Sequence, residues 1–249
     1  ITRMDADDVM APDKIFELKT ILQASGPGTI ATGKVKYFSD QKLGQGYQKY
    51  EQWLNTQLES INVFSQIYRE CVLPSPNWMM FREDLDRIGG FGKDVYPEDY
   101  DLCFRAYQAG LKIQSSRKVI HFWRDHSNRH TRSHPDWQDA SFLEFKLSWF
   151  LKLDFDSTRP LILWGAGKKG KRLAKVLRDR KTAFTWVCEN RKKVGHRIYD
   201  QEVKLPENTS FPRLSQVIAA VSQRGASAEI ERFLTQVKEL PLNCQYFFC

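Results

Sequence analysis

The 249-residue sequence lacks several features that would place it in a class at once. Its longest apolar runs, such as 160–164 and 217–221, are far shorter than the roughly 20 residues that cross a bilayer. Its five cysteines are odd in number and widely spaced, and no CxxC pair occurs. We therefore expect neither a disulfide scaffold nor a cysteine zinc site, and we expect a reducing compartment. Internal repeats and low-complexity tracts are also missing.

Charge is unevenly distributed along the chain. Residues 1–158 hold 20 Lys and Arg against 22 Asp and Glu, whereas residues 159–249 hold 18 against 8. Hydrophobic residues make up 41% of the sequence, which is enough for packed cores. The pattern changes at 154–160, so we predict a domain at 1–153, a linker at 154–160 and a small basic domain at 161–249.

The first domain mixes helical and extended patterns, and the second reads as a small βαβ unit with the look of half a dinucleotide-binding fold. We therefore predict an α/β protein with two domains. In the first domain we predict a strand end at 1–4, a helix from Pro12 to Gly26, strands at 29–38, 78–81 and 118–123, and helices at 47–68, 84–88, 99–110 and 139–153. In the second we predict strands at 161–164, 183–188, 217–221 and 245–248, and helices at 171–179 and 228–237.

Three carboxylates in four residues follow the first predicted strand end. Asp5, Asp7 and Asp8 repel one another unless a cation lies among them. Hard oxygen ligands suit Mg²⁺ or Mn²⁺, so we interpret Asp5 and Asp7 as candidate metal ligands. The alternative, above all for Asp8, is a helix N-terminus, where carboxylates interact favourably with the helix dipole.

A second acidic motif, PEDYDLCFR, occupies 97–105. Glu98 and Asp99 are predicted at a helix start, where a carboxylate that faces a pocket can act as a general base. Taken alone, the motif favours helix capping. Asp101 and Arg105 are four residues apart, which predicts a structural ion pair.

Together these motifs resemble the family 2 glycosyltransferases, which have the GT-A fold. The sequence RMDADD at 3–8 looks like that family's DxD segment. The sequences MMFREDLDRIGGF at 79–91 and PEDYDLCFR at 97–105 look like its acceptor-side segment and its ED motif. WRDH at 123–126 is similar to a strand-end segment that often follows in bacterial members. The resemblance covers about residues 1–153.

The resemblance implies metal-dependent, inverting transfer of a sugar from a nucleotide-diphosphate sugar to a hydroxyl of a glycan or lipid-linked acceptor. Asp7 would coordinate the Mn²⁺ or Mg²⁺ that bridges the diphosphate, and Asp5 would contact the nucleotide ribose or support the metal. Asp99 would take the proton from the acceptor hydroxyl, and Glu98 would shape that site. The chemistry agrees, because a divalent ion stabilises the leaving diphosphate and a positioned carboxylate activates a hydroxyl.

The family's domain also has a strand–helix half that binds the nucleotide base ahead of the DxD segment. In this sequence the acidic motif begins at Asp5. We therefore expect the domain at 1–153 to be N-terminally truncated, and a chain that starts at Ile1 to lack much of the donor site.

Histidines recur at 121, 126, 130 and 134, with arginines at 124, 129 and 132 among them. Cations next to a metal oppose its binding, so we expect His130 and His134 in a polar surface loop. His126 is different, because a residue in this region of similar enzymes can reach the metal or the diphosphate. We therefore include it among the candidate metal ligands.

The sequence GAGKKG at 165–170 lies between a predicted strand and a predicted helix. Glycines at such a turn let a phosphate approach backbone N–H groups at the helix start, and the neighbouring lysines add positive charge. An acidic residue ends the next strand near the usual offset for ribose binding. The alternative is that the glycines only permit a tight turn. The candidate nucleotide-binding residues are Gly165, Gly167, Gly170 and Glu189.

Helix 139–153 is amphipathic and rich in Phe and Trp, which is also typical of an interfacial membrane helix. It has few basic residues, so we favour packing on the transferase domain.

Two hypotheses follow. The first, which the resemblance implies, is a glycosyltransferase of cell-surface polysaccharide biosynthesis, placed in the cytoplasm or peripherally at the inner face of the membrane. The second is a non-catalytic module that binds a nucleotide or nucleotide-sugar, with a remnant transferase domain. The basic residues are dispersed and no recognition motif occurs, so we expect no nucleic-acid partner. The basic half would serve phosphate-bearing ligands or an anionic membrane surface.

Overall fold

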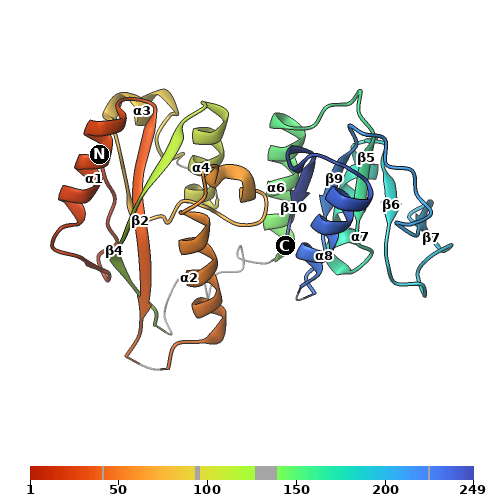
Figure 1. Cartoon of the computed structure of the whole chain (residues 1–249), viewed down its shortest axis with the longest axis horizontal. Coiled ribbons are helices and arrows are strands. Elements are labelled where there is room, and N and C mark those ends of the chain that lie inside the picture. The colour runs from red at the N-terminus through yellow and green to blue at the C-terminus, as the bar shows by residue number, and fades with distance from the viewer. Residues whose placement is uncertain (41, 93–95, 127–138, 224) are drawn as a thin grey trace. The chain divides into compact units, whose positions relative to one another are not determined.

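A computed structural model describes the chain except for residues 41, 93–95, 127–138 and 224. The chain divides into two units, one of Ile1–Ile67 with Cys71–Asp136 and the other of Tyr68–Glu70 with Trp137–Cys249. Each unit has its own β-sheet with covering helices (Figure 1). The predicted α/β class is therefore confirmed.

The sheet of the first unit has the strand order β1–β4–β2–β3. The two long strands β2 and β4 run parallel, whereas β1 and β3 are antiparallel to their neighbours. The strands are β1 (Val9–Met10), β2 (Thr29–Phe38), β3 (Trp78–Met80) and β4 (Lys112–Arg124). The helices are α1 (Lys14–Ser25), α2 (Gln45–Gln57), a 3₁₀ turn (Val63–Gln66), α3 (Arg82–Arg87) and α4 (Glu98–Gln108).

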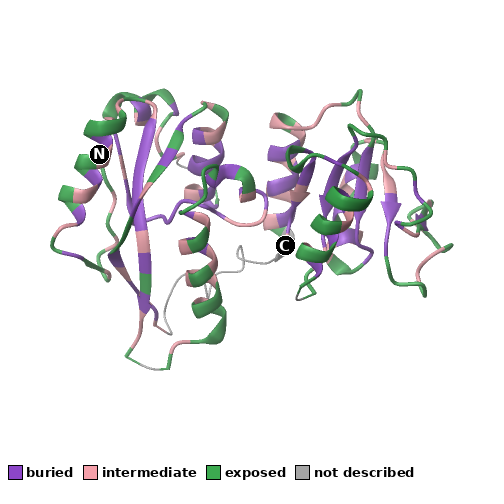
Figure 2. Ribbon diagram, viewed as in Figure 1, coloured by how far each residue is buried: buried purple, intermediate pink, exposed green. Residues whose placement is uncertain are grey.

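Apolar residues of α1 pack on this sheet. Leu18 and Leu22 of α1 contact Ala31 of β2 and Ile120 of β4 in one buried cluster. Figure 2 shows the buried residues concentrated along β2 and on the inner side of α1. The helix thus covers one face of the sheet and fixes the segment that precedes it against β4.

The predicted strand 29–38 and helix 139–153 are confirmed with the same bounds. The predicted helix 47–68 is too long, because α2 ends at Gln57 and turns follow. Ile61, which the helical spacing places on a buried face, is fully exposed in those turns. At the predicted strand end 1–4, Thr2 forms an isolated bridge with Met79, and β1 was not predicted.

The sheet of the second unit has the strand order β10–β9–β5–β6–β8–β7, and all neighbours are parallel except β7 and β8. The first strand of the unit, β5, is central. Strands β6, β7 and β8 lie on one side of β5, and β9 and β10 lie on the other. The order in which strands are added to the sheet therefore reverses direction beside β5. The strands are β5 (Leu161–Trp164), β6 (Thr185–Val187), β7 (Arg197–Ile198), β8 (Gln201–Lys204), β9 (Gln216–Ala219) and β10 (Gln245–Phe247).

The central strands of this sheet are buried on both faces, as their continuous apolar sequences require. Ile162 and Trp164 of β5 and Val217 of β9 join Ile230 of α8 and Leu234 in the core. The short strands β7 and β8 were not predicted, because their sequences are mostly polar. The helices are α6 (Asp139–Leu153), α7 (Lys168–Asp179), α8 (Ala226–Arg232), a π turn (Phe233–Val237) and a 3₁₀ turn (Leu242–Cys244).

Helix α6 is grouped with the second unit, whereas we expected it to pack on the first domain. The ring of Phe150 lies 4.7 Å from that of Tyr246 and 6.3 Å from that of Phe248, next to β10. Glu144 of α6 also pairs with Arg172 of α7 at 2.6 Å. The division of the chain therefore falls before α6 and not at the predicted linker 154–160. None of the helices in the described ranges has both the length and the apolar composition to span a bilayer.

Candidate functional site

The acidic segment Asp5–Asp8 is fastened to the end of β4. The backbone N–H of Arg124 donates to Asp8 Oδ1 at 2.8 Å, and Arg124 Nε donates to the backbone oxygen of Asp7 at 2.9 Å. Immediately after the segment, Val9 and Met10 pair with β4 as strand β1. These contacts fix the backbone of the segment and direct the side chains of Asp7 and Asp8 to different partners.

Asp7 faces His126. Asp7 Oδ2 lies 3.0 Å from His126 Nε2, and the two side chains are 49% and 38% exposed. The two groups are within hydrogen-bond distance of each other. Of the two, the carboxylate is the ligand type that suits Mg²⁺ or Mn²⁺. They are a partial set: within the described part of the chain, no three His, Cys, Asp or Glu side chains are grouped so that they could hold a metal.

Asp5 is directed toward a cation. Asp5 Oδ1 lies 3.4 Å from Arg3 Nε. Burial raises the pKa of the Asp5 carboxyl, Arg3 opposes this shift, and the neighbouring carboxylates of Asp8 and Asp7 add to it. The structure thus brings Asp7 and His126 together and places Asp5 with Arg3.

Arg3 links the two acidic motifs. Its Nη2 lies 3.8 Å from Glu98 Oε1, at the first residue of α4, and its guanidinium carbon lies 5.2 Å from the centre of the Phe91 ring. The acidic segment and the ED motif are about 90 residues apart in sequence. Through Arg3, they lie next to each other in the first unit.

Asp99 lies in the first turn of α4, next to Glu98. It is half-buried, and its Oδ1 accepts a hydrogen bond from the backbone N–H of Tyr100 at 2.8 Å. Burial raises the pKa of Asp99 to about 6, the Glu98 carboxylate adds to the shift, and Arg3 opposes it. A carboxyl with a pKa close to the working pH suits proton abstraction, because it is ionised and still basic.

Pro97 is the N-cap residue of α4 and offers no side-chain cap. Asp99 instead accepts from the Tyr100 N–H in the first turn of the helix, as the capping alternative predicts. The structural ion pair predicted in the same motif is confirmed, with Arg105 Nε 2.7 Å from Asp101 Oδ2. The motif therefore contains one structural pair and two carboxylates, Glu98 and Asp99, that are close to Arg3.

The histidines have different environments. His121 is fully buried and contacts Asp8 and Lys14, whereas His126 is partly exposed beside Asp7. His130 and His134 lie outside the described residues. Sequence reasoning missed Lys14, although a signal was present: it precedes Leu18 and Leu22 by four and eight residues, on the buried stripe of α1.

The glycine-rich turn of the second unit is sterically specified. Gly165 has φ +112°, and a Cβ there would lie 2.9 Å from the backbone oxygen of Ala220. A Cβ on Gly170 would lie 1.9 Å from the backbone oxygen of Gly165, so the start of α7 packs directly on the turn. A Cβ on Gly167, the residue before α7, meets nothing within 4 Å. The turn therefore leaves open space at the start of α7, where N–H groups can receive an anion.

Other polar groups surround this turn. Lys193 Nζ donates to the backbone oxygen of Ala166 at 2.7 Å, and Trp186 Nε1 donates to that of Gly165 at 2.8 Å. Glu189 follows β6 and is exposed. Partial burial raises the pKa of its carboxyl, and the carboxylates of Glu229 and Glu207 add to the shift.

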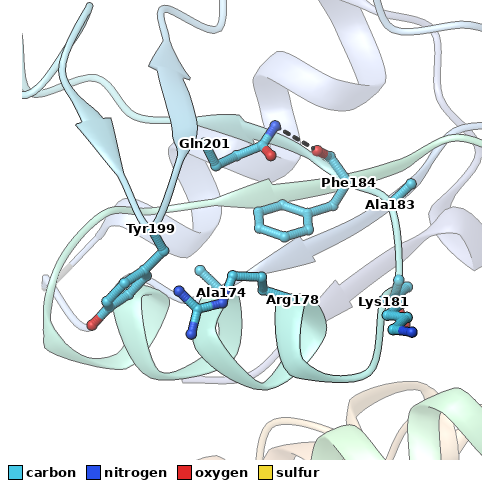
Figure 3. A pocket seen from close by; sticks show the side chains of 8 residues that line it. Ala174, Arg178, Lys181, Ala183, Phe184, Tyr199 and Gln201 are labelled. Carbon is cyan, nitrogen blue, oxygen red and sulfur yellow. Dashed lines mark hydrogen bonds between the residues drawn. The ribbon is translucent and has the colours of Figure 1, made fainter.

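A cavity of about 180 Å³ lies elsewhere in the second unit (Figure 3). Arg178 and Lys181 line it, together with Phe184 before β6 and the hairpin residues Tyr199 and Gln201. Because β5 and β6 are parallel, the residues before β6 lie at the amino ends of the strands, whereas the turn after β5 lies at their carboxyl ends. This cavity is therefore separate from the glycine-rich turn.

No protein-family model matches this chain, and no curated protein matches its sequence significantly.

Substitutions at Gly170 and Gly167 are expected to have different effects on stability. We expect Gly170→Ala to lower the free energy of unfolding by about 1–3 kcal/mol, because the methyl group overlaps the Gly165 backbone. Gly167→Ala has open space and an ordinary φ of −77°, so we expect a change within about 1 kcal/mol. Urea unfolding followed by circular dichroism measures both. Equal stability of the two variants would contradict this account of the turn.

Proposed function

We propose that this chain carries the catalytic part of a metal-dependent, inverting glycosyltransferase of the GT-A type. It would move a sugar from a nucleotide-diphosphate sugar to a hydroxyl of a glycan or lipid-linked acceptor. The observation that carries the proposal is the bridge of Arg3 between Asp5 and Glu98. The bridge brings together the two acidic motifs that resemble those of family 2. Asp99, the proposed base, follows Glu98 directly, and burial raises its pKa to about 6.

In the proposed reaction, Asp7 and His126 would hold Mn²⁺ or Mg²⁺. The ion supplies positive charge that stabilises the leaving diphosphate. Asp99 takes the proton from the acceptor hydroxyl as the bond to the sugar forms. Burial and the Glu98 carboxylate raise the pKa of Asp99, and Arg3 opposes that shift. A single displacement of this kind needs one base and no enzyme nucleophile.

We propose that the second unit is a Rossmann-like domain that binds a nucleotide or nucleotide-sugar. Its winding reverses beside β5, and ligands of open parallel sheets bind outside the carboxyl ends of the strands at such a reversal. The open space at Gly167, directly before α7, supports a phosphate at this edge. In this proposal the glycine-rich turn binds the phosphate and Glu189 binds the ribose. This binding role also stands without the transferase proposal, because it depends on different residues.

The excess of basic residues in 159–249 suits phosphate-bearing ligands or an anionic membrane surface. We propose action in the cytoplasm, with peripheral contact at the inner face of the membrane and products destined for cell-surface glycans.

The metal assignment predicts the effect of Asp7→Asn. We expect the Mn²⁺ concentration that gives half-maximal hydrolysis of the donor to rise at least about tenfold, because an amide oxygen carries no negative charge. The measurement uses the natural polypeptide that contains these residues. Asp179→Asn is the control, since it removes an exposed carboxylate from the second unit. Unchanged metal dependence in Asp7→Asn, or full activity in excess chelator, would defeat the mechanism.

The assignment of Asp99 as the base predicts the pH profile of transfer. The base must be ionised, so we expect the rate to fall as the pH drops through about 6. Glu98→Gln should move this limb to lower pH, because it removes a carboxylate that raises the pKa of Asp99. Arg3→Gln should move it to higher pH. Asp99→Asn should lower the rate by about 10²- to 10⁴-fold. A limb that stays in place in both neighbouring variants would exclude Asp99 as the group that titrates.

The nucleotide site of the second unit predicts that UDP binds in the presence of a chelator. We expect Gly167→Asp to weaken this binding by about tenfold or more, because the new carboxylate occupies the space proposed for the phosphate. Gly46→Asp in α2 is the matched control, since a Cβ there also meets nothing within 4 Å. Isothermal titration calorimetry compares the two variants. Equal affinity in both would locate UDP elsewhere.

A further inference from the structure

Lys14 is buried at the start of α1, with 1% of its surface exposed. Its ammonium group donates to the backbone oxygen of Pro76 at 2.8 Å and lies 3.0 Å from His121 Nδ1 and 3.7 Å from Met4 Sδ. These partners come from three other segments of the first unit. Lys14 lies on the same buried stripe of α1 as Leu18 and Leu22, where an apolar residue is usual. Its polar partners must therefore compensate for the free-energy cost of burying a charge.

The chemistry of these groups fixes the direction of their hydrogen bonds. An ammonium group only donates, so His121 Nδ1 must accept from Lys14. The proton of the neutral imidazole is then on Nε2, which donates to Asp8 Oδ2 at 2.8 Å. Burial lowers the pKa of Lys14 to about 8, and the carboxylates of Asp8 and Asp5 oppose the shift. Lys14 is thus joined to Asp8 through the two ring nitrogens of His121.

Asp8 uses both of its oxygens in this arrangement. Oδ2 accepts from His121, Oδ1 accepts from the backbone N–H of Arg124, and the side chain is 1% exposed. The next residue toward the N-terminus, Asp7, has a side chain that is 49% exposed and faces His126. Asp8 is therefore the anchor of the acidic segment, and Asp7 is the member that remains open to a ligand.

We infer that Lys14, His121 and Asp8 form a positioning network that holds the acidic segment on β4 so that Asp7 stays opposite His126. The metal role of that pair rests on the proposed function. The positioning itself rests on the contacts of Lys14 with Pro76 and His121, and on those of Asp8 with His121 and the backbone of Arg124.

The test compares Lys14→Met with Lys118→Met in the full chain. Methionine keeps the length of the side chain and removes the charge. Lys118 is exposed and forms ion pairs with Asp13 and Glu17, so it controls for the loss of a lysine next to α1. Hydrogen–deuterium exchange, read by mass spectrometry, reports the order of residues 1–10. Electron paramagnetic resonance measures the concentration of free Mn²⁺ and so gives the metal affinity in the absence of the nucleotide-sugar.

We expect Lys14→Met to raise deuterium uptake in residues 1–10 and to weaken Mn²⁺ binding at least about tenfold, while Lys118→Met changes neither. The inference is overturned if uptake in residues 1–10 is unchanged, or if it rises equally across α1 and β4 while the Mn²⁺ affinity is unaltered. If Lys14→Met does not fold, Asp8→Asn decides by the same two measurements, since it keeps the size of the side chain and loses one acceptor.

A different result would contradict the proposed function. A wild-type chain that binds no Mn²⁺ would contradict the metal role of Asp7 and His126. The exchange measurement would still support or overturn the positioning network.

Discussion

The buried charge of Lys14 is the constraint on which the first unit depends. A cation in this position requires acceptors, and the chain supplies them from distant segments: His121 of β4, Pro76 before β3 and, through the histidine, Asp8. Removing one member of such a group leaves an uncompensated charge, which commonly costs about 3–5 kcal/mol. The same contacts that satisfy Lys14 also set the path of the acidic segment, so the stability of this unit and the geometry of its candidate site have a common origin.

The second unit reaches its arrangement by steric means. At the glycine-rich turn, backbone meets backbone at distances that no side chain permits, and α7 starts immediately afterwards. Close packing at Gly170 brings the helix onto the turn, while Gly167 leaves space in front of the first helical N–H groups. The two candidate sites are therefore positioned by different interactions. In the first unit, buried polar contacts orient the carboxylates, and in the second, glycines allow the backbone of α7 to approach the turn.

The sequence predicted what depends on local pattern. The alternation in 29–38 and the helical spacing in 139–153 gave these two elements their observed bounds, and the glycine-rich turn lies between a strand and a helix as expected. The spacing of Asp101 and Arg105 also predicted their ion pair. Two features were not predicted. The strands β7 and β8 are short and mostly polar, and α6 packs with β10 from the far end of the chain. For the site, residue type indicated the acidic motifs and His126, whereas the burial of Lys14 and the bridge made by Arg3 depend on the folded sheet.

Arg3 has a consequence for how the two acidic motifs behave energetically. It lies within 3.4 Å of one carboxylate from the first motif and 3.8 Å of one from the second, so the motifs share a single counter-ion. Neutralising either carboxylate frees Arg3 to interact more strongly with the other. The free-energy effects of substitutions at Asp5 and Glu98 are thus not additive, although the two residues are distant in sequence. The free-energy effect of a substitution at residue 3, 5 or 98 therefore depends on which residues occupy the other two positions.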